Sequence, residues 1–193
     1  MRRKLYRLTV QAMQSTDLTA SYFELFGLPA GFDIDGKALM ERYRELQRAV
    51  HPDKFANASD AERRLSVQVA SRVNEGYRTL KDPLARARYL LELKGVELND
   101  TDTALDGGFL MEQMELRERL EEAKGAADSP QRLQKLGDDI RGHEDALVAE
   151  LQKLFDNGDA QALAKARDAS RKLQFFRRLA DELIGLEDDL ALS

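Results

Sequence analysis

The chain has 193 residues, with 30 Lys and Arg, 35 Asp and Glu, two His, and no Cys or Trp. This length is enough for one large domain or two small ones. The lack of cysteine excludes disulfides, thiolate nucleophiles, cysteine-based zinc sites and cysteine-ligated iron–sulfur clusters in this chain. Two histidines leave little material for a metal site or a histidine-rich active site, so the composition argues against most enzymes.

The composition favours an all-α fold. Charged residues make up 34% of the chain, whereas about 25% is usual, and prolines and tyrosines are few. No apolar run approaches the roughly 18 residues that a membrane helix needs, so we expect no membrane partner. A net charge of -5 gives no general basis for nucleic-acid binding.

Four helices are predicted in the N-terminal half. A capping box, in which a serine N-cap is followed three residues later by glutamate, begins a short helix at Ser21. A second helix follows Asp33 or Asp35 and ends near His51, because the residue before Pro52 is biased out of the α region.

A second capping box at Ser59 begins the third helix, which the Asp-Pro pair at 82–83 closes. The fourth helix, 84–94, ends at a glycine in the expected position after the helix. These elements predict a domain over residues 20–95, preceded by an N-terminal extension at 1–19.

Three longer helices are predicted beyond a linker at 96–106. The first ends near Lys124, and the second has Ser129 as its N-cap and Pro130 at its first helical position. An Asn-Gly-Asp stop precedes the last helix. Three amphipathic helices joined by short turns predict an antiparallel bundle over 107–193.

His143 lies on the apolar stripe of the middle helix, three residues after Ile140 and four before Leu147. We therefore expect a buried or half-buried histidine with a packing role. A metal-ligand role is disfavoured because no second His or Cys is available to complete a site.

Charge divides unevenly along the chain. Residues 1–104 hold 17 basic and 15 acidic side chains, whereas residues 105–193 hold 13 basic and 20 acidic ones. The second helix and the turn after it are rich in basic residues: Lys37, Arg42, Arg44, Arg48 and Lys54. A basic helix on an acidic protein favours an acidic protein partner, although a solvated helix face explains the charges equally well.

The tripeptide His51-Pro52-Asp53 lies at the tip between two helices that are predicted to be antiparallel. Pro52 fixes φ and holds its neighbours in an exposed turn. Asp53 suits an arginine of another protein through a bidentate, charge-assisted hydrogen bond. As a general acid–base pair, His51 and Asp53 lack a third group and a pocket, so we favour a protein contact, with a plain loop turn as the alternative.

The helix after residue 106 has two faces at about 100° per residue. Its core stripe holds Phe109, Leu116, Leu120 and Ala123. A second face mixes apolar side chains with carboxylates: Leu110, Met111, Met114, Glu115 and Glu118. Such a face is typical of an adaptable protein-binding surface. Packing against the third helix of the bundle or against the N-terminal domain explains the pattern equally well.

Four stretches of the sequence carry a family resemblance. The first comprises two segments, Tyr22 to Leu28 and YRELQRAVHPDKF at 43–55. The others are VNEGYRTLKDPLARARYLL at 73–91, FLMEQMELRE at 109–118 and RKLQFF at 171–176. The first two resemble the J-domain of DnaJ-type co-chaperones, and the last two narrow the match. Together they resemble the HscB family, the J-domain co-chaperones of bacterial iron–sulfur cluster assembly, over about residues 20–190.

The resemblance implies two binding sites. A J-domain at 20–95 would bind a DnaK-class chaperone ATPase of the HscA type through His51, Pro52, Asp53, Lys54, Arg42, Arg44 and Arg48. A C-terminal bundle would bind an IscU-type iron–sulfur scaffold protein through Leu110, Met111, Met114, Glu115, Glu118 and Phe175. Because Phe175 lies at the edge of its helix's apolar stripe beside Phe176, a core role for it is an alternative.

The resemblance predicts a co-chaperone that stimulates ATP hydrolysis by its partner and delivers the scaffold protein to it. ATP, magnesium and the catalytic groups would belong to the partner, so we expect no catalytic residue, cofactor or metal here. We expect a monomer or weak self-association. A J-domain adaptor for a different client and a helical nucleic-acid-binding protein are the alternatives.

The location of the protein follows from the same resemblance. Some eukaryotic relatives carry an N-terminal cysteine metal site and a mitochondrial presequence, and the absence of cysteine here favours the bacterial cytoplasm. The basic start of the chain (Arg2, Arg3, Lys4 and Arg7), with no acidic residue before Asp17, would instead indicate the mitochondrial matrix if residues 1–20 are a presequence.

Overall fold

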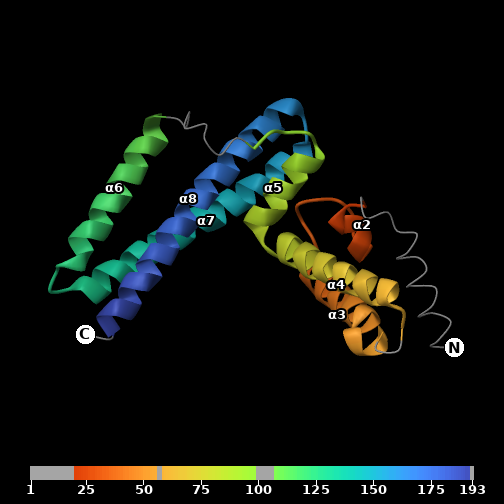
Figure 1. Ribbon diagram of the computed structural model, residues 1–193. Coiled ribbons are helices and arrows are strands. Elements are labelled where there is room, and N and C mark those ends of the chain that lie inside the picture. The colour runs from red at the N-terminus through yellow and green to blue at the C-terminus, as the bar shows by residue number, and fades with distance from the viewer. Residues whose placement is uncertain (1–19, 56–57, 99–106, 192–193) are drawn as a thin grey trace. The chain divides into compact units, whose positions relative to one another are not determined.

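The computed structural model describes residues 20–55, 58–98 and 107–191, and within these ranges the chain is helical with no strand. The chain divides into two compact units, with the division between Leu90 and Leu91 (Figure 1). The predicted extension at 1–19 and most of the predicted linker lie outside the described residues. No helix in the described ranges is long and apolar enough to cross a membrane.

The first unit holds the helices expected for its part of the chain. They are α2 (Tyr22–Phe26), α3 (Gly36–Val50), the 3-10 helix η1 (Pro52–Phe55), α4 (Asp60–Lys81) and most of α5 (Pro83–Leu93). The helix ends follow from local chemistry: Asp35, and not Asp33, caps α3 by accepting from the backbone N–H groups of Lys37 and Ala38. Gly27 ends α2 with φ at 63°, a conformation that glycine adopts without steric cost.

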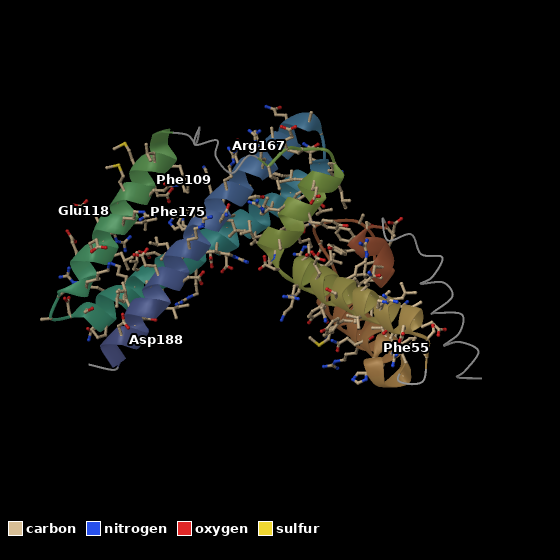
Figure 2. All side chains as sticks on the ribbon, viewed as in Figure 1. Phe55, Phe109, Glu118, Arg167, Phe175 and Asp188 are labelled. Carbon is tan, nitrogen blue, oxygen red and sulfur yellow. The ribbon has the colours of Figure 1, made fainter. Side chains whose placement is uncertain are left out.

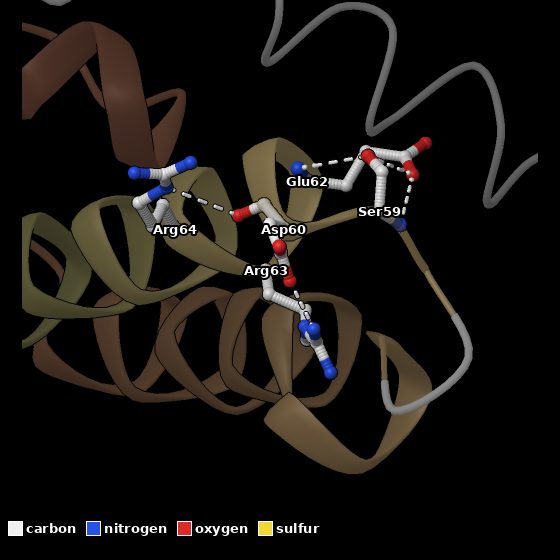
Figure 3. Close-up of polar contacts among 5 residues, drawn as sticks. All are labelled: Ser59, Asp60, Glu62, Arg63 and Arg64. Carbon is white, nitrogen blue, oxygen red and sulfur yellow. Dashed lines mark hydrogen bonds and ion pairs between the residues drawn. The ribbon is translucent and has the colours of Figure 1, made fainter.

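Both predicted capping boxes form. At the start of α4, the Glu62 backbone N–H donates to Ser59 Oγ at 3.3 Å, and Glu62 Oε2 accepts from the Ser59 backbone N–H at 2.9 Å (Figure 3). Ser21 and Glu24 make the same reciprocal pair at α2. These contacts satisfy N–H groups that a helix start would otherwise leave without partners.

The helices α3 and α4 pack as a hairpin, and α2 covers α4. Leu39, Val50, Val69 and Val73 are buried between them. The α2 helix approaches α4 closely at Gly76, where a Cβ atom would lie only 2.8 Å from Tyr22 Cδ1. A side chain at this position would therefore collide with α2.

The second unit is a helical bundle made of α6 (Gly107–Lys124), α7 (Ser129–Asn157) and α8 (Ala160–Ala191). In Figure 1, α7 and α8 form a long antiparallel pair and α6 lies along one part of it. The fully buried side chains of this pair include Leu133, Leu136, Ile140, Leu151 and Leu173. This arrangement agrees with the three-helix bundle predicted from the sequence.

Two details of α7 differ from the sequence prediction. Ser129 is not the N-cap: Asp128 holds that position without a side-chain cap, because its carboxylate accepts from Arg132 Nε at 2.7 Å instead. Ser129 is the first helical residue, and it is buried. His143 is more exposed than predicted: its ring stacks on Phe176 at 4.7 Å, and 46% of its side chain remains accessible.

Candidate functional site

The turn that carries the His-Pro-Asp tripeptide follows directly from α3. His51 is the C-cap of α3, with extended backbone angles, and its carbonyl accepts from the Lys54 N–H at 3.0 Å. The side chains of His51 and Lys54 are exposed, whereas Phe55 is buried and anchors the far end of η1. The turn thus presents the His51 and Lys54 side chains to solvent on a short, hydrogen-bonded support.

The predicted basic residues of α3 lie on its surface beside this turn. Arg42 pairs with Glu45 at 3.0 Å, and Arg48 Nε donates to the Arg44 carbonyl at 3.2 Å. A cleft of about 590 Å³ lies at the foot of the turn, lined by Arg44, Gln47, Arg48, Val50, His51, Ala70 and Asn74. The structure therefore brings His51 together with two of the three predicted arginines, and Arg42 does not line the cleft.

A polar network that the sequence did not reveal joins α3 to α4 at this cleft. The Tyr43 hydroxyl donates to Asn74 Oδ1 at 2.9 Å, and Gln47 Nε2 donates to Asn74 Oδ1 and to the Tyr43 hydroxyl. The Tyr43 ring also stacks on Tyr77 at 4.0 Å. The contacts of Gln47 and Asn74 depend on the pairing of the two helices, which the sequence pattern does not show.

The second face of α6 is open to solvent in its own unit. The exposed fractions of Leu110, Met111 and Met114 are 56%, 73% and 66%. Glu115 and Glu118 are exposed as well, and Figure 2 shows Glu118 pointing away from the bundle. Packing against α7 or α8, one of the alternatives left by the sequence, therefore does not explain this face.

Phe175 of α8 lies beside α6, half-buried. Its ring meets Phe109 edge to face at 5.6 Å and Phe176 at 5.5 Å, and Figure 2 shows it between α6 and α8. Phe176 is the deeper ring, with 2% of its surface accessible. Phe175 thus contacts the core and keeps part of its surface accessible, an arrangement that is compatible with both roles that the sequence left open.

The opposite edge of α6 is attached to α7 by charged groups. Arg119 donates to Asp139 Oδ2 at 2.6 Å, and this hydrogen bond is the main reason that the pKa of Asp139 lies below its ordinary value. His143 Nδ1 lies 3.4 Å from Glu112 Oε1. These contacts set the rotation of α6, which turns its apolar second face outward.

The described residues contain no group of three or more His, Cys, Asp or Glu side chains that could hold a metal ion. The described side chains of the two predicted sites are mostly exposed apolar and charged groups. Their chemistry suits protein recognition.

Known proteins resemble the chain in both units. A family model described as the HSCB C-terminal oligomerisation domain matches residues 105–184. A curated relative from Shewanella baltica strain OS195, named co-chaperone protein HscB homolog, is 47% identical over 171 residues, which cover 88% of this chain and 98% of the relative. The chain belongs to the HscB co-chaperone family.

Solved structures agree with the HscB assignment. Chaperone HscB from Vibrio cholerae superposes with a TM-score of 0.80 and 43% identity, covering 89% of this chain and 99% of the other. The crystal structure of human co-chaperone protein HscB gives a TM-score of 0.80 with 31% identity, covering 86% of this chain and 82% of the other. The predicted all-α fold, with a J-domain and a C-terminal bundle, is confirmed.

The family assignment also decides between the functions considered for the sequence. This HscB-family chain is a co-chaperone, and the comparisons favour this function over nucleic-acid binding. The exposed α3 arginines are accordingly better explained by a protein partner than by a phosphate backbone.

Proposed function

We propose that this HscB-family chain stimulates the ATPase of an HscA-type, DnaK-class chaperone with its first unit and delivers an IscU-type scaffold protein with its second. The observation that carries the proposal is the presence of two surfaces on separate units: the turn with the exposed His51 and Lys54 beside a basic helix, and an exposed apolar face on α6. The role belongs to iron–sulfur cluster assembly and transfer.

The chaperone-binding site in this proposal comprises the turn and the α3 arginines: His51, Pro52, Asp53, Lys54, Arg42, Arg44 and Arg48. The arginines would attract an acidic surface of the chaperone and raise the rate of association. The turn would then contact one conformational state of the chaperone more favourably than the other. Only such a difference in affinity can shift the chaperone toward hydrolysis, since ATP and its catalytic groups are held by the partner.

The scaffold-binding site in this proposal is the open α6 face with Phe175 at its edge. Two flexible methionines and a leucine give an adaptable apolar centre, and Glu115 and Glu118 give it a charged rim. The half-buried Phe175 ring adds a rigid aromatic contact of the kind that often dominates binding energy.

The first experiment measures steady-state ATPase of the cognate chaperone with the wild-type chain and with its His51→Gln variant. We expect the wild type to stimulate hydrolysis and the variant to stimulate little, because glutamine cannot reproduce the ring at the tip. Gln68→Ala, an exposed change on α4 away from the predicted site residues, is the matched control and should stimulate normally. Equal stimulation by His51→Gln and the wild type would refute the assigned role of the turn.

The second experiment measures scaffold binding by calorimetry with the Leu110→Ala, Met114→Ala double variant. We expect weaker binding by about tenfold or more, because two exposed apolar contacts are lost. Ile184→Ala, an exposed apolar residue on α8, controls for nonspecific effects of truncation. Unchanged affinity with an intact helical spectrum would refute the assigned face.

We also propose that the protein acts in the bacterial cytoplasm as a monomer or with weak self-association. The Shewanella and Vibrio relatives support a bacterial setting. The matching family model is described as an oligomerisation domain, so sedimentation velocity over a range of concentrations is the appropriate test of self-association.

A further inference from the structure

Two cations lie over the aromatic rings that join α6 to α8. Arg117 Cζ lies 6.0 Å from the centroid of the Phe175 ring, and Lys172 Nζ lies 5.2 Å from that of Phe109. Arg117 is exposed and Lys172 is half-buried. The rings hold both positive groups near one edge of the α6 face.

Arg117 of α6 and Lys172 of α8 differ from the other two basic side chains of α6. Arg119 pairs with Asp139 at 2.6 Å, and Lys124 pairs with Glu121 at 2.6 Å. Among the described residues, the two cations over the rings form no ion pair. Their charge is therefore available to a carboxylate of another molecule.

The position of Arg117 places it on the open face itself. It follows Leu110 by seven residues and Met114 by three, so the three side chains lie on one side of α6. Glu115 and Glu118 lie on the other side of the same face, roughly 100° to 160° around the helix. The apolar centre is thus bordered by positive charge next to α8 and by negative charge on the opposite edge.

We infer that Arg117 and Lys172 bind a carboxylate of the scaffold protein, next to the apolar group that contacts Leu110 and Phe175. This inference rests on the proposed scaffold binding and adds a specificity determinant to it. A guanidinium binds a carboxylate with two parallel hydrogen bonds, and arginine is enriched among dominant interface residues. The opposite signs of the two edges fix the orientation in which an acidic–apolar surface can dock.

The test compares charge reversals in the full chain by calorimetry with the scaffold protein. Arg117→Glu and Lys172→Glu should each weaken binding by about tenfold or more, because repulsion replaces attraction. Lys153→Glu, on an exposed position of α7, makes the same change in net charge and should stay within about twofold of the wild type. Arg117→Lys keeps the charge but cannot form the two parallel hydrogen bonds, so its affinity should lie between those of the wild type and Arg117→Glu.

Salt gives a second readout that a merely structural role would not change. Raising the salt concentration should weaken wild-type binding, and this dependence should be smaller in Arg117→Glu. Circular dichroism confirms that each variant remains helical. Equal affinity and equal salt dependence in the Arg117, Lys172 and Lys153 reversals would overturn the inference.

The failure of this inference can be distinguished from failure of the proposed function. If Leu110→Ala with Met114→Ala weakens scaffold binding while the reversals do not, the face stands and only the role of the cations is wrong. If the reversals instead alter self-association in sedimentation and leave scaffold binding unchanged, the carboxylate belongs to a second copy of this chain and the inference is overturned.

Discussion

Arg86 lies buried in the first unit, where its side chain connects three segments. Its Nη1 donates to the Leu80 carbonyl at 2.6 Å, and its guanidinium lies 4.8 Å from the centroid of the Phe32 ring. Burial lowers the pKa of the guanidinium, while the charges of Asp82 and Asp33 act in the opposite direction. The buried cation therefore ties the loop before α3 and the end of α4 to α5.

Replacing this cation tests its structural role. We expect Arg86→Met to lower the free energy of unfolding by about 1–3 kcal/mol, because the buried Leu80 carbonyl loses its donor while the apolar stem is retained. Urea unfolding measures the change. Arg64→Met, at an exposed position of α4, should cost less than about 0.5 kcal/mol. Equal costs for the two variants would contradict the role assigned to Arg86.

A single glycine limits the packing of α2 on α4. The Cβ of an alanine at position 76 would lie 2.8 Å from Tyr22 Cδ1 and 3.0 Å from Phe26 Cε2. We expect Gly76→Ala to destabilise the protein by about 1–3 kcal/mol through this overlap, although alanine is the better helix former. Gly142→Ala has open space around its Cβ and should stabilise by up to about 1 kcal/mol. Thermal or urea unfolding of both variants tests whether their free energies of unfolding change in opposite directions. A stabilising effect of Gly76→Ala would show that α2 can move away to accommodate the Cβ atom.

At the scale of elements, the start of α4 couples helix stability to pH. Hydrogen bonds from the Ser59 backbone and hydroxyl hold the pKa of Glu62 below its ordinary value of 4.5 (Figure 3). The folded state therefore favours the carboxylate. The stability that the Glu62 carboxylate contributes to the folded state is complete above about pH 4.5. It is lost as the pH falls through the lower pKa that Glu62 has in the folded state.

The capping box predicts a specific change in acid stability. Glu62→Gln keeps an acceptor at this position but cannot titrate, so its stability should depend less on pH below about 4.5 than that of the wild type. Urea midpoints measured from neutral pH down to about pH 3 provide the comparison. Glu41→Gln, on the exposed surface of α3, should retain the wild-type pH dependence. If the stabilities of Glu62→Gln and Glu41→Gln depend on pH in the same way below about pH 4.5, the capping box is not the source of the pH dependence.

The attachment of α6 illustrates how elements position the second site. Arg119 and Glu112 contact α7 on one edge, and Phe109 contacts α8 on the other. Since α6 rotates as a rigid helix, these contacts on its inner side determine which residues face outward. The orientation of the exposed methionines is thus a property of the bundle and not of α6 alone.

At the scale of the whole molecule, the two proposed sites lie on different compact units, which predicts that their functions separate. We expect His51→Gln to lose ATPase stimulation while keeping wild-type scaffold affinity. The Leu110→Ala, Met114→Ala variant should show the reverse, with normal stimulation of the chaperone in the absence of scaffold. Parallel ATPase and calorimetry measurements on both variants decide the point, and loss of both activities in either variant would mean that the units are coupled.

The sequence alone determined the helices, most of their caps and the family. Capping boxes, proline stops and apolar stripes act between residues close in the chain, so they could be predicted without tertiary contacts, and the motif around His51 located the turn. The sequence prediction misplaced the α7 N-cap, because the pattern of capping residues does not reveal that the Asp128 carboxylate accepts from Arg132. It also overestimated the burial of His143, since a stripe position does not reveal how far the neighbouring helix reaches.

Only the tertiary structure decided which helix faces remain uncovered and which side chains meet across helices. The residue pattern around α6 was compatible with a binding surface and with a packed surface. The rotation of α6 against α7 and α8 decides between them, because it leaves Met111 and Met114 exposed. The contacts of Asn74, Arg86 and Arg117 join segments distant in the chain. Such contacts depend on the relative placement of helices, which local periodicity does not encode.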